Sequence, residues 1–233
     1  MPIKAVAFDV WNTLLNIDEV FEQIAHTASD RLKINLQEVV KSIAHAYSSS
    51  KTLRRYGEVD GFQIVLESQK ILARELSIDV DEVVEIINEA LSLVDANDLL
   101  FDDAREILKI LGRLGFKMGI IGNVVFWSSI YTRRILKQVG VLDYMDVVMF
   151  SDELRINKPD RRIFLKFSRE IGVEPSYIAY VGDSIIEDVG GALSAGMRAI
   201  YIDRSRKEKI ILGDVGIAII TNLLEVVDAL DSL

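Results

Sequence analysis

The stretch IKAVAFDVWNTLL, residues Ile3–Leu15, decides the fold that the sequence predicts. Its first part, Ile3–Phe8, is a short apolar run without the strict alternation of polar and apolar residues that marks a half-exposed strand. Such runs are typical of parallel strands that are covered on both faces. Asp9 follows directly, at the edge of the sheet where open α/β proteins bind their ligands. The chain therefore begins with a parallel strand, and Asp9 is the first candidate functional residue.

Further apolar runs follow, separated by segments with helical periodicity. The remaining expected strands are Lys117–Ile121, Asp146–Phe150, Tyr177–Val181 and Arg198–Ile202, with an edge strand at Gly216–Ile220. The expected helices of this part are Asp102–Leu114, Trp127–Val139, Arg161–Ile171, Ile185–Ala195 and Asn222–Leu230. Alternating strands and helices predict an α/β fold with a Rossmann-like, doubly wound parallel sheet.

One long interval, from Asn16 to Asn97, contains no strand run and is helical throughout. Its expected helices are Ile17–Leu32, Leu36–Ser49, Gly61–Leu76 and Asp79–Leu93. A crossover between parallel strands needs only a dozen or so residues, so this interval is too long for one. We therefore expect a Rossmann-like catalytic core formed by residues 1–15 and 98–233, and an all-helical cap formed by residues 16–97.

The composition excludes several classes of function. The 233 residues include no cysteine, which excludes disulfides, thiolate metal sites and cysteine nucleophiles. With 27 basic and 36 acidic residues the net charge is -9, and an acidic chain repels phosphate backbones, so we expect no nucleic-acid partner. No run approaches the roughly 20 apolar residues that span a bilayer, so we expect no membrane association. A cytoplasmic protein, either monomer or homodimer, fits this composition.

Carboxylates gather at two predicted strand ends. A carboxylate in the position of Asp9 can attack phosphorus or carbon and form a covalent intermediate, although an aspartate there can also cap the next segment. The run Val181–Asp188 places Asp183 at the end of another strand, with Asp188 about one helical turn further on. Three such carboxylates repel one another unless a cation lies between them, and oxygen ligands favour Mg²⁺. The alternative is that Asp183 and Asp188 only interact with a helix dipole.

Two further segments lie at strand ends. Lys158, which precedes Pro159 and a predicted helix, is placed to neutralise Asp9 or the oxygens of a phosphoryl group, unless it is an ordinary exposed lysine. Gly122 and Asn123 follow another strand, where backbone N–H groups at a turn can bind an anion.

In order and spacing these motifs resemble the haloacid dehalogenase-like hydrolase superfamily, over essentially the whole chain. Its phosphatase members are similar in particular to four segments: Val181–Asp188, Asn157–Asp160, Gly190–Ala192 and Ala195–Met197. The resemblance implies a magnesium-dependent phosphatase that acts on a small phosphate ester through an aspartyl-phosphate intermediate. It also implies that residues 16–97 are a helical cap, which closes over the site and selects the substrate.

The resemblance also implies a role for each matching residue. Asp9 is the expected nucleophile and a magnesium ligand, and the Trp11 carbonyl is a second ligand from the same loop. Asp183 is expected to bind magnesium directly, and Asp188 to support it through water or through Lys158. Lys158 is expected to steady Asp9 and the transferring phosphoryl group. We expect Trp11, together with Gly122 and Asn123, to face the substrate.

Two residues depart from the pattern of the family's phosphatases. Trp11 stands where they usually carry a second aspartate, which protonates the leaving oxygen and activates the hydrolytic water; indole cannot exchange a proton near neutral pH. Gly122 stands where they usually carry serine or threonine, so one donor to the phosphate is missing. Both departures bear on the reaction rather than on the fold.

These departures keep two alternatives open. The family's 2-haloacid dehalogenases carry an aromatic residue at the position of Trp11 and release a halide that needs no proton, but they do not use magnesium and lack the pair Asp183 and Asp188. The second alternative is a catalytically weak, ligand-binding or regulatory member. Of the remaining charged residues, we expect Arg54 and Arg55 on a solvated turn rather than over the site, and Glu187 pointing to solvent.

Overall fold

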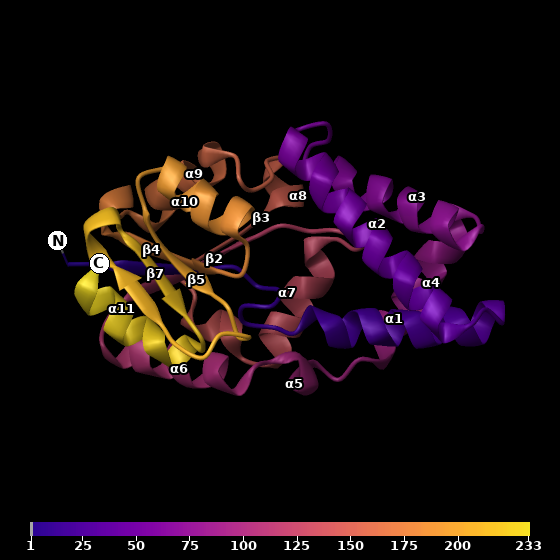
Figure 1. Cartoon of the computed structure of the whole chain (residues 1–233), viewed down its shortest axis with the longest axis horizontal. Helices are drawn as coiled ribbons and strands as arrows, with labels where there is room; N and C mark the ends of the chain where they lie inside the picture. Colours follow the sequence, from indigo (N-terminus) through magenta and orange to yellow (C-terminus); the bar gives the residue numbers. More distant parts are fainter. Residues whose placement is uncertain (1) are drawn as a thin grey trace.

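The computed structural model describes residues 2–233, and a seven-stranded sheet lies at its centre (Figure 1). The strand order is β3-β2-β1-β4-β5-β7-β6, and every neighbouring pair is parallel except β6 and β7. The bounds are Ala5–Phe8 for β1, Lys117–Gly122 for β2, Val147–Phe150 for β3, Ile178–Gly182 for β4, Arg198–Ile202 for β5, Ile210–Leu212 for β6 and Ile217–Ile220 for β7. The predicted fold class is confirmed.

Helices cover both faces of the sheet. Successive side chains of β1 point to opposite faces, so Ala7 belongs to the hydrophobic cluster under α9 (Arg161–Ile171). Phe8 belongs instead to the larger cluster, which includes α6 (Asp102–Arg113). Figure 1 shows α9 and α10 on one side of the strands and α6 and α11 on the other. The remaining helices of this part are α7 (Ser129–Gln138), α8 (Ser151–Leu154), α10 (Gly191–Ser194) and α11 (Val226–Ser232).

Four helices between β1 and the short helix α5 (Ala96–Leu99) pack against one another, at the end of the molecule away from both chain termini (Figure 1). The side chains of Asn16 and Asn35 accept hydrogen bonds from backbone N–H groups at the starts of α1 and α2, which fixes where these helices begin. The four helices are α1 (Ile17–Leu32), α2 (Leu36–Tyr56), α3 (Gln63–Leu76) and α4 (Val80–Leu93).

The structure corrects three predictions. Helix α2 continues past Ser49 to Tyr56, because Gly57 in the left-handed conformation provides the stop. The predicted edge strand, β7, is covered by the short antiparallel strand β6, which the sequence analysis missed. The predicted helix Ile185–Ala195 begins as a π-helical turn, Ile185–Gly190, before α10.

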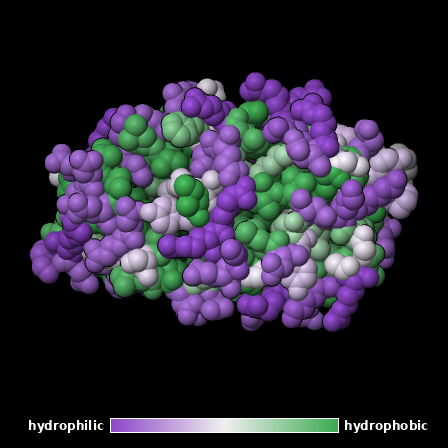
Figure 2. Space-filling view, turned by 180° about the vertical axis from the view of Figure 1, so that it is seen from behind, coloured by the Kyte–Doolittle hydropathy of each residue, from purple (hydrophilic) through white to green (hydrophobic). Residues whose placement is uncertain are grey.

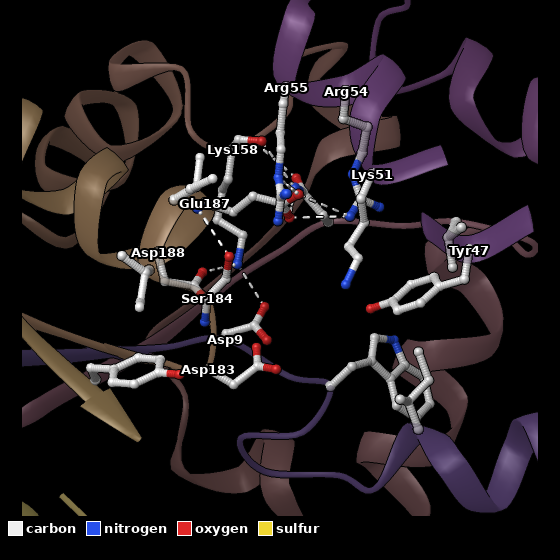
Figure 3. A pocket seen from close by; sticks show the side chains of 17 residues that line it. Asp9, Tyr47, Lys51, Arg54, Arg55, Lys158, Asp183, Ser184, Glu187 and Asp188 are labelled. Atoms are coloured by element: carbon white, nitrogen blue, oxygen red, sulfur yellow. Dashed lines mark hydrogen bonds and ion pairs between the residues drawn. The ribbon is translucent and has the colours of Figure 1, made fainter. Parts of the chain in front are cut away.

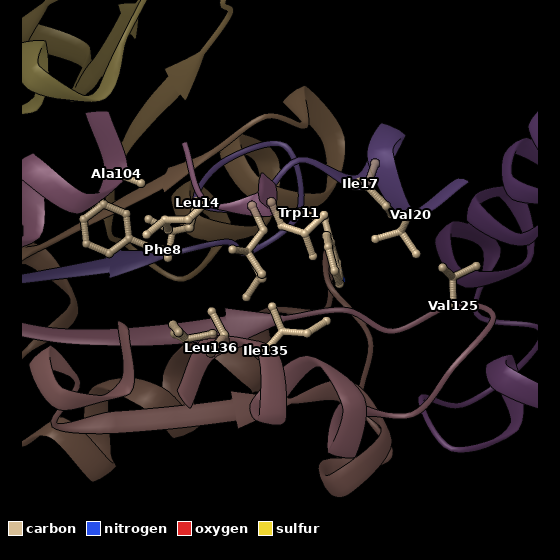
Figure 4. Packing of buried hydrophobic residues seen from close by; sticks show 14 of the residues in the cluster. Phe8, Trp11, Leu14, Ile17, Val20, Ala104, Val125, Ile135 and Leu136 are labelled. Carbon is tan, nitrogen blue, oxygen red and sulfur yellow. The ribbon is translucent and has the colours of Figure 1, made fainter. Parts of the chain in front are cut away.

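A continuous apolar core joins the sheet to the four helices. Phe8 and Trp11 share one buried cluster with Val20 of α1 and Val125 (Figure 4). None of the helices in residues 2–233 combines the length and the apolar character that crossing a bilayer requires. Hydrophilic and hydrophobic side chains are interspersed on the face seen from behind (Figure 2).

Candidate active site

The predicted catalytic residues converge at the carboxyl ends of β1 and β4. A pocket of about 270 Å³ lies there, between the sheet and helix α2. Asp9, Lys158, Asp183 and Asp188 all line it (Figure 3). Asp9 follows β1, and its backbone N–H donates to the carbonyl of Val181 at 2.8 Å. The parallel register of β1 and β4 therefore brings residues far apart in the chain to one place.

Lys158 is the centre of a buried ionic network. Its Nζ donates to Asp9 Oδ1 at 2.6 Å and to Asp188 Oδ1 at 2.7 Å, and only 1% of Lys158 is exposed. The third donor reaches the Tyr180 hydroxyl at 2.8 Å, which in turn donates to the carbonyl of Ile121. Burial alone lowers the pKa of Lys158, but Asp188 and Asp9 outweigh it and raise the pKa above its usual value. Lys158 is therefore a fixed positive charge beside Asp9.

The turn after β4 needs glycine at position 182. A Cβ atom there would collide with the carboxylate of Asp188, so only glycine lets Asp188 approach the strand end so closely. The two oxygens of Asp188 accept hydrogen bonds from Lys158 Nζ and from the Ser184 N–H, the latter at 2.9 Å. Asp183, which lies in this turn between Gly182 and Ser184, is half-buried, and its side chain accepts no hydrogen bond within residues 2–233.

Burial, followed by mutual repulsion, disfavours the charged forms of Asp9 and Asp183. Burial, with the nearby Asp188, raises the pKa of Asp9 to about 6, although Lys158 opposes this. Burial, followed by Asp9 and Asp188, raises the pKa of Asp183 to about 8. Both groups ordinarily titrate near 3.8. The single positive charge of Lys158 therefore does not balance the three carboxylates that meet here.

These three carboxylates form a donor set that suits a small hard cation. One oxygen from each of Asp9, Asp183 and Asp188 lies within 4.8 Å of the others. Oxygen-only ligands in this number are what Mg²⁺ prefers. Because Asp188 already accepts from Lys158 and Ser184, the open carboxylate positions belong to Asp9 and Asp183. The residues present fit magnesium.

Asn123 and Gly122 have structural tasks at this edge of the sheet. The Asn123 side chain accepts from the Lys158 N–H at 2.9 Å and donates to its carbonyl at 3.1 Å, and also donates to Glu187 at 3.1 Å. It therefore positions the segment that carries Lys158. A Cβ atom on Gly122 would lie 2.6 Å from the ring of Phe150, so the space of a serine hydroxyl is already filled. Contact of Gly122 and Asn123 with substrate stays a prediction.

Replacing Gly122 by the usual serine is expected to destabilise the protein. The new side chain meets Phe150, and overpacking of this kind costs about 1–3 kcal/mol in the free energy of unfolding. Urea unfolding of Gly122→Ser measures the loss. The double variant Gly122→Ser, Phe150→Leu should be more stable than the single Gly122→Ser variant, and equal loss in both would refute the steric explanation.

Arg54 and Glu187 form a buried ion pair, so two predictions were wrong: Arg54 and Arg55 lie in helix α2 beside the pocket rather than on a solvated turn, and Glu187 does not point to solvent. Glu187 is 5% exposed and accepts from Arg54 Nη2 at 3.1 Å and from Arg55 Nε at 3.3 Å. Despite the opposing cost of burial, the two arginines and Lys158 lower its pKa. Since α2 extends to Tyr56, its last turn carries both arginines to the site.

Side chains of α2 and α3 also hold the segment after β2. Three successive carbonyls, of Val124, Val125 and Phe126, accept from Arg54 at 2.8 Å, Ser68 at 3.0 Å and Gln69 at 2.9 Å, respectively. The position of the four helices is thereby coupled to Asn123 and, through it, to Lys158.

Loss of Arg54 is therefore expected to destabilise the protein far more than loss of Arg55. Arg54→Met leaves Glu187 buried without its main partner, and breaking such a pair costs about 3–5 kcal/mol. Arg55→Met removes a partly exposed partner and should cost less than about 1 kcal/mol. Chemical unfolding of both variants measures the two losses in the free energy of unfolding. Similar losses would show that the buried pair of Arg54 and Glu187 stabilises the protein no more than the partly exposed pair of Arg55 and Glu187.

Three residues of the site were not predicted from the sequence: Tyr180, Tyr47 and Lys51. Tyr180 is the one polar side chain in the strand run 178–182, and this interruption of an apolar run was the available signal. Tyr47 and Lys51 lie on α2 and line the pocket opposite Asp9 (Figure 3). Nothing in the local pattern of α2 distinguishes them from other residues of an amphipathic helix.

Trp11 is part of the wall between the sheet and the four helices. Its ring meets that of Trp127 edge to face, with centroids 5.5 Å apart, and Trp127 in turn contacts Phe21 of α1. Trp11 is 8% exposed and lines the pocket, where it presents an apolar surface; its contact with a substrate stays a prediction.

The sequence is similar to those of known phosphatases and dehalogenases. The chain is 31% identical over 109 residues to the glyceraldehyde 3-phosphate phosphatase of Methanopyrus kandleri, which covers 46% of this chain and 44% of that protein. It thus spans less than half the length of this relative. It is 27% identical over 208 residues to (S)-2-haloacid dehalogenase 1 of a Pseudomonas species, covering 88% of this chain and 87% of that one.

A solved structure is similar over its full length. The haloacid dehalogenase-like phosphatase of Thermococcus onnurineus is 28% identical, and each chain covers 99% of the other with a TM-score of 0.65. The family model of the haloacid dehalogenase-like hydrolases matches residues 3–196, which include Asp9, Lys158 and both later aspartates. The match spans most of the chain, and we conclude that this protein is a member of the haloacid dehalogenase-like hydrolase family.

Proposed function

We propose that this hydrolase is a magnesium-dependent phosphatase that transfers the phosphoryl group of a small phosphate ester to Asp9. The observation that carries the proposal is the cluster of Asp9, Asp183 and Asp188 around one point, with a single buried lysine as its counter-charge. A dehalogenase needs no cation, and three carboxylates without one would be costly. We also propose residues 16–97 as the cap that closes the pocket.

Each residue has a task in the proposed reaction. Asp9, with Asp183, would hold magnesium, together with the Trp11 carbonyl; the ion supplies positive charge that offsets the charge of the transferring phosphoryl group. The unprotonated carboxylate of Asp9 attacks phosphorus, and the ester oxygen leaves. Lys158 orients Asp9 through the 2.6 Å hydrogen bond and provides a second positive charge. Water then attacks the phosphorus of the aspartyl-phosphate, the bond between the Asp9 oxygen and phosphorus breaks, and inorganic phosphate leaves with the Asp9 carboxylate restored.

Trp11 limits the leaving groups that this site accepts. General acid–base help is worth roughly 10²–10⁴-fold in rate, and indole supplies none. We therefore propose that the enzyme favours esters whose leaving oxygen needs little protonation, and that its aspartyl-phosphate breaks down slowly.

The second candidate is a 2-haloacid dehalogenase. Similarity to (S)-2-haloacid dehalogenase 1 covers 88% of the chain, and Trp11 presents an aromatic surface beside Asp9. In that reaction Asp9 attacks carbon and displaces a halide. Incubation with 2-chloropropionate and measurement of chloride release tests this candidate. The remaining alternative is a ligand-binding or regulatory protein whose site binds a ligand without turnover.

Hydrolysis of p-nitrophenyl phosphate tests the proposal. The assay compares magnesium, EDTA, and magnesium with the Asp9→Asn variant. We expect turnover only in the first case. Turnover in the presence of EDTA would show that the reaction does not need magnesium. Absence of turnover under all three conditions, together with chloride release from 2-chloropropionate, would favour the dehalogenase.

Stabilisation by magnesium is expected to increase with pH. In the metal-free protein the pKa of Asp183 is about 8 and that of Asp9 about 6, so the folded state keeps protons that the unfolded chain has lost. The free energy of unfolding therefore falls as the pH rises from about 4 to about 8. Magnesium replaces these protons, so its effect on Tm should be larger at pH 8 than at pH 5. Asp183→Asn should remove most of this difference, and an effect independent of pH would contradict the carboxylate cluster as the binding site.

A further inference from the structure

The wall of the pocket formed by α2 carries one cation without a partner. Tyr47, Lys51 and Arg54 recur at intervals of three or four residues and so share one face of the helix. Arg54 is bound to Glu187, and Lys158 to two aspartates. Within residues 2–233 no carboxylate lies within ion-pair distance of Lys51, so its charge remains available to a ligand.

Neighbouring aromatic rings hold Lys51 in place. Its Nζ lies 4.3 Å from the centroid of the Tyr47 ring, and this ring packs edge-on against Phe21 with centroids 5.0 Å apart. The side chain points into the pocket from the wall opposite Lys158, with the Tyr47 hydroxyl beside it (Figure 3). Burial raises the pKa of Tyr47, so the phenol stays a neutral hydrogen-bond donor. The ammonium and the hydroxyl thus form a preformed pair of donors.

This arrangement costs free energy in the absence of a ligand. Burial lowers the pKa of Lys51, because water is partly excluded and the more distant carboxylates of Glu187 and Asp183 compensate its charge only in part. An anion that enters the pocket would remove this cost and gain a charge-assisted hydrogen bond. The Lys51 ammonium carries one positive charge, which matches a carboxylate better than a second phosphate with nearly two negative charges.

We propose that Lys51 and the Tyr47 hydroxyl bind a carboxylate of the substrate, which makes the substrate class small phosphorylated carboxylic acids whose leaving oxygen needs little protonation. This inference rests on the proposed phosphatase function, which assigns the phosphoryl group to Asp9 and Lys158. The pocket volume of about 270 Å³ restricts the acid to a few carbon atoms.

Binding of phosphonates that cannot be hydrolysed tests the inference without any turnover. Calorimetry in magnesium compares phosphonoacetate with ethylphosphonate, and phosphonopropionate with propylphosphonate; each pair differs in a carboxylate and a methyl group. We expect one carboxylated compound to bind at least about tenfold more tightly than its partner. Lys51→Met should abolish this preference, and Lys51→Arg should keep part of it. Lys41→Met, which alters an exposed lysine on the same helix, should leave it unchanged.

Three outcomes would overturn the inference but not the phosphatase function. In the first, the wild type binds both members of each pair equally, and in the second, Lys51→Met still binds the carboxylated member more tightly. In the third, Lys51→Met weakens the binding of both members of a pair equally. The last result would assign Lys51 to the phosphoryl group instead. Failure of all four phosphonates and of p-nitrophenyl phosphate to bind would contradict the proposed function itself.

Discussion

Asp9→Asn is expected to lower the rate of phosphate release by about 10⁴- to 10⁶-fold while the protein stays folded. The amide is a poor nucleophile, and loss of a nucleophile costs rates of this order. Its oxygen can still accept the hydrogen bond from Lys158, so the network around Lys158 keeps its geometry. Initial rates with p-nitrophenyl phosphate and a thermal unfolding curve measure both effects.

Asp143→Asn is the matched control for this variant. Asp143 is exposed and precedes β3, at the edge of the sheet away from the pocket. It should keep wild-type activity. Full activity in Asp9→Asn, or equal losses in both variants, would be incompatible with a nucleophilic role of Asp9.

Lys158→Met is expected to affect both activity and stability. The substitution leaves Asp9 and Asp188 buried without their common counter-charge, which should cost about 3–5 kcal/mol in the free energy of unfolding. Removal of one charged donor beside the transferring group should also lower kcat by roughly 10²–10³-fold. Unfolding in urea and steady-state kinetics measure the two losses.

Magnesium should restore part of the stability of Lys158→Met, because it supplies positive charge to the same carboxylates. Lys166→Met is the control, since Lys166 pairs only with the exposed Glu170 on the surface of α9. It should cost less than about 1 kcal/mol. A similar loss in both variants would contradict the central place of Lys158 in the buried network.

The parallel core and the catalytic cluster were predictable because their signals are local. Apolar runs such as Ile3–Phe8 mark strands buried on both faces, and the carboxyl ends of such strands meet at one edge. Asp9, Asp183 and Lys158 could therefore be placed together without any knowledge of their distances. The strand β6 gave no such signal, because Ile210–Leu212 is only three residues long and only its middle residue is partly buried.

Pairings between distant residues were not predictable. Arg54 and Glu187 are 133 positions apart, and each taken alone looks like an ordinary surface charge. The contact depends on how far α2 extends and on the π-helical turn that carries Glu187. Helix ends and turns of this kind are set by tertiary packing rather than by the local pattern. For the same reason the role of Lys51 could be proposed only from the structure.

The structure gives Trp11 a role that the sequence did not predict. In the sequence Trp11 stands where an acid is expected, whereas in the fold it packs against Trp127 and joins the sheet to the four helices. Its replacement by aspartate would therefore remove apolar packing as well as add a proton donor. Tryptophan at this position therefore contributes to the packing between the sheet and the four helices.

Detection of the covalent intermediate shows whether Asp9 is the nucleophile. The enzyme is mixed with magnesium and p-nitrophenyl phosphate, quenched in acid within the first turnovers, digested and analysed by mass spectrometry. We expect a phosphoryl group on Asp9, accumulating because Trp11 cannot activate the hydrolytic water, and none in Asp9→Asn. A phosphoryl group on another residue, or rapid phosphate release without any modification of Asp9, would contradict the nucleophilic role of Asp9.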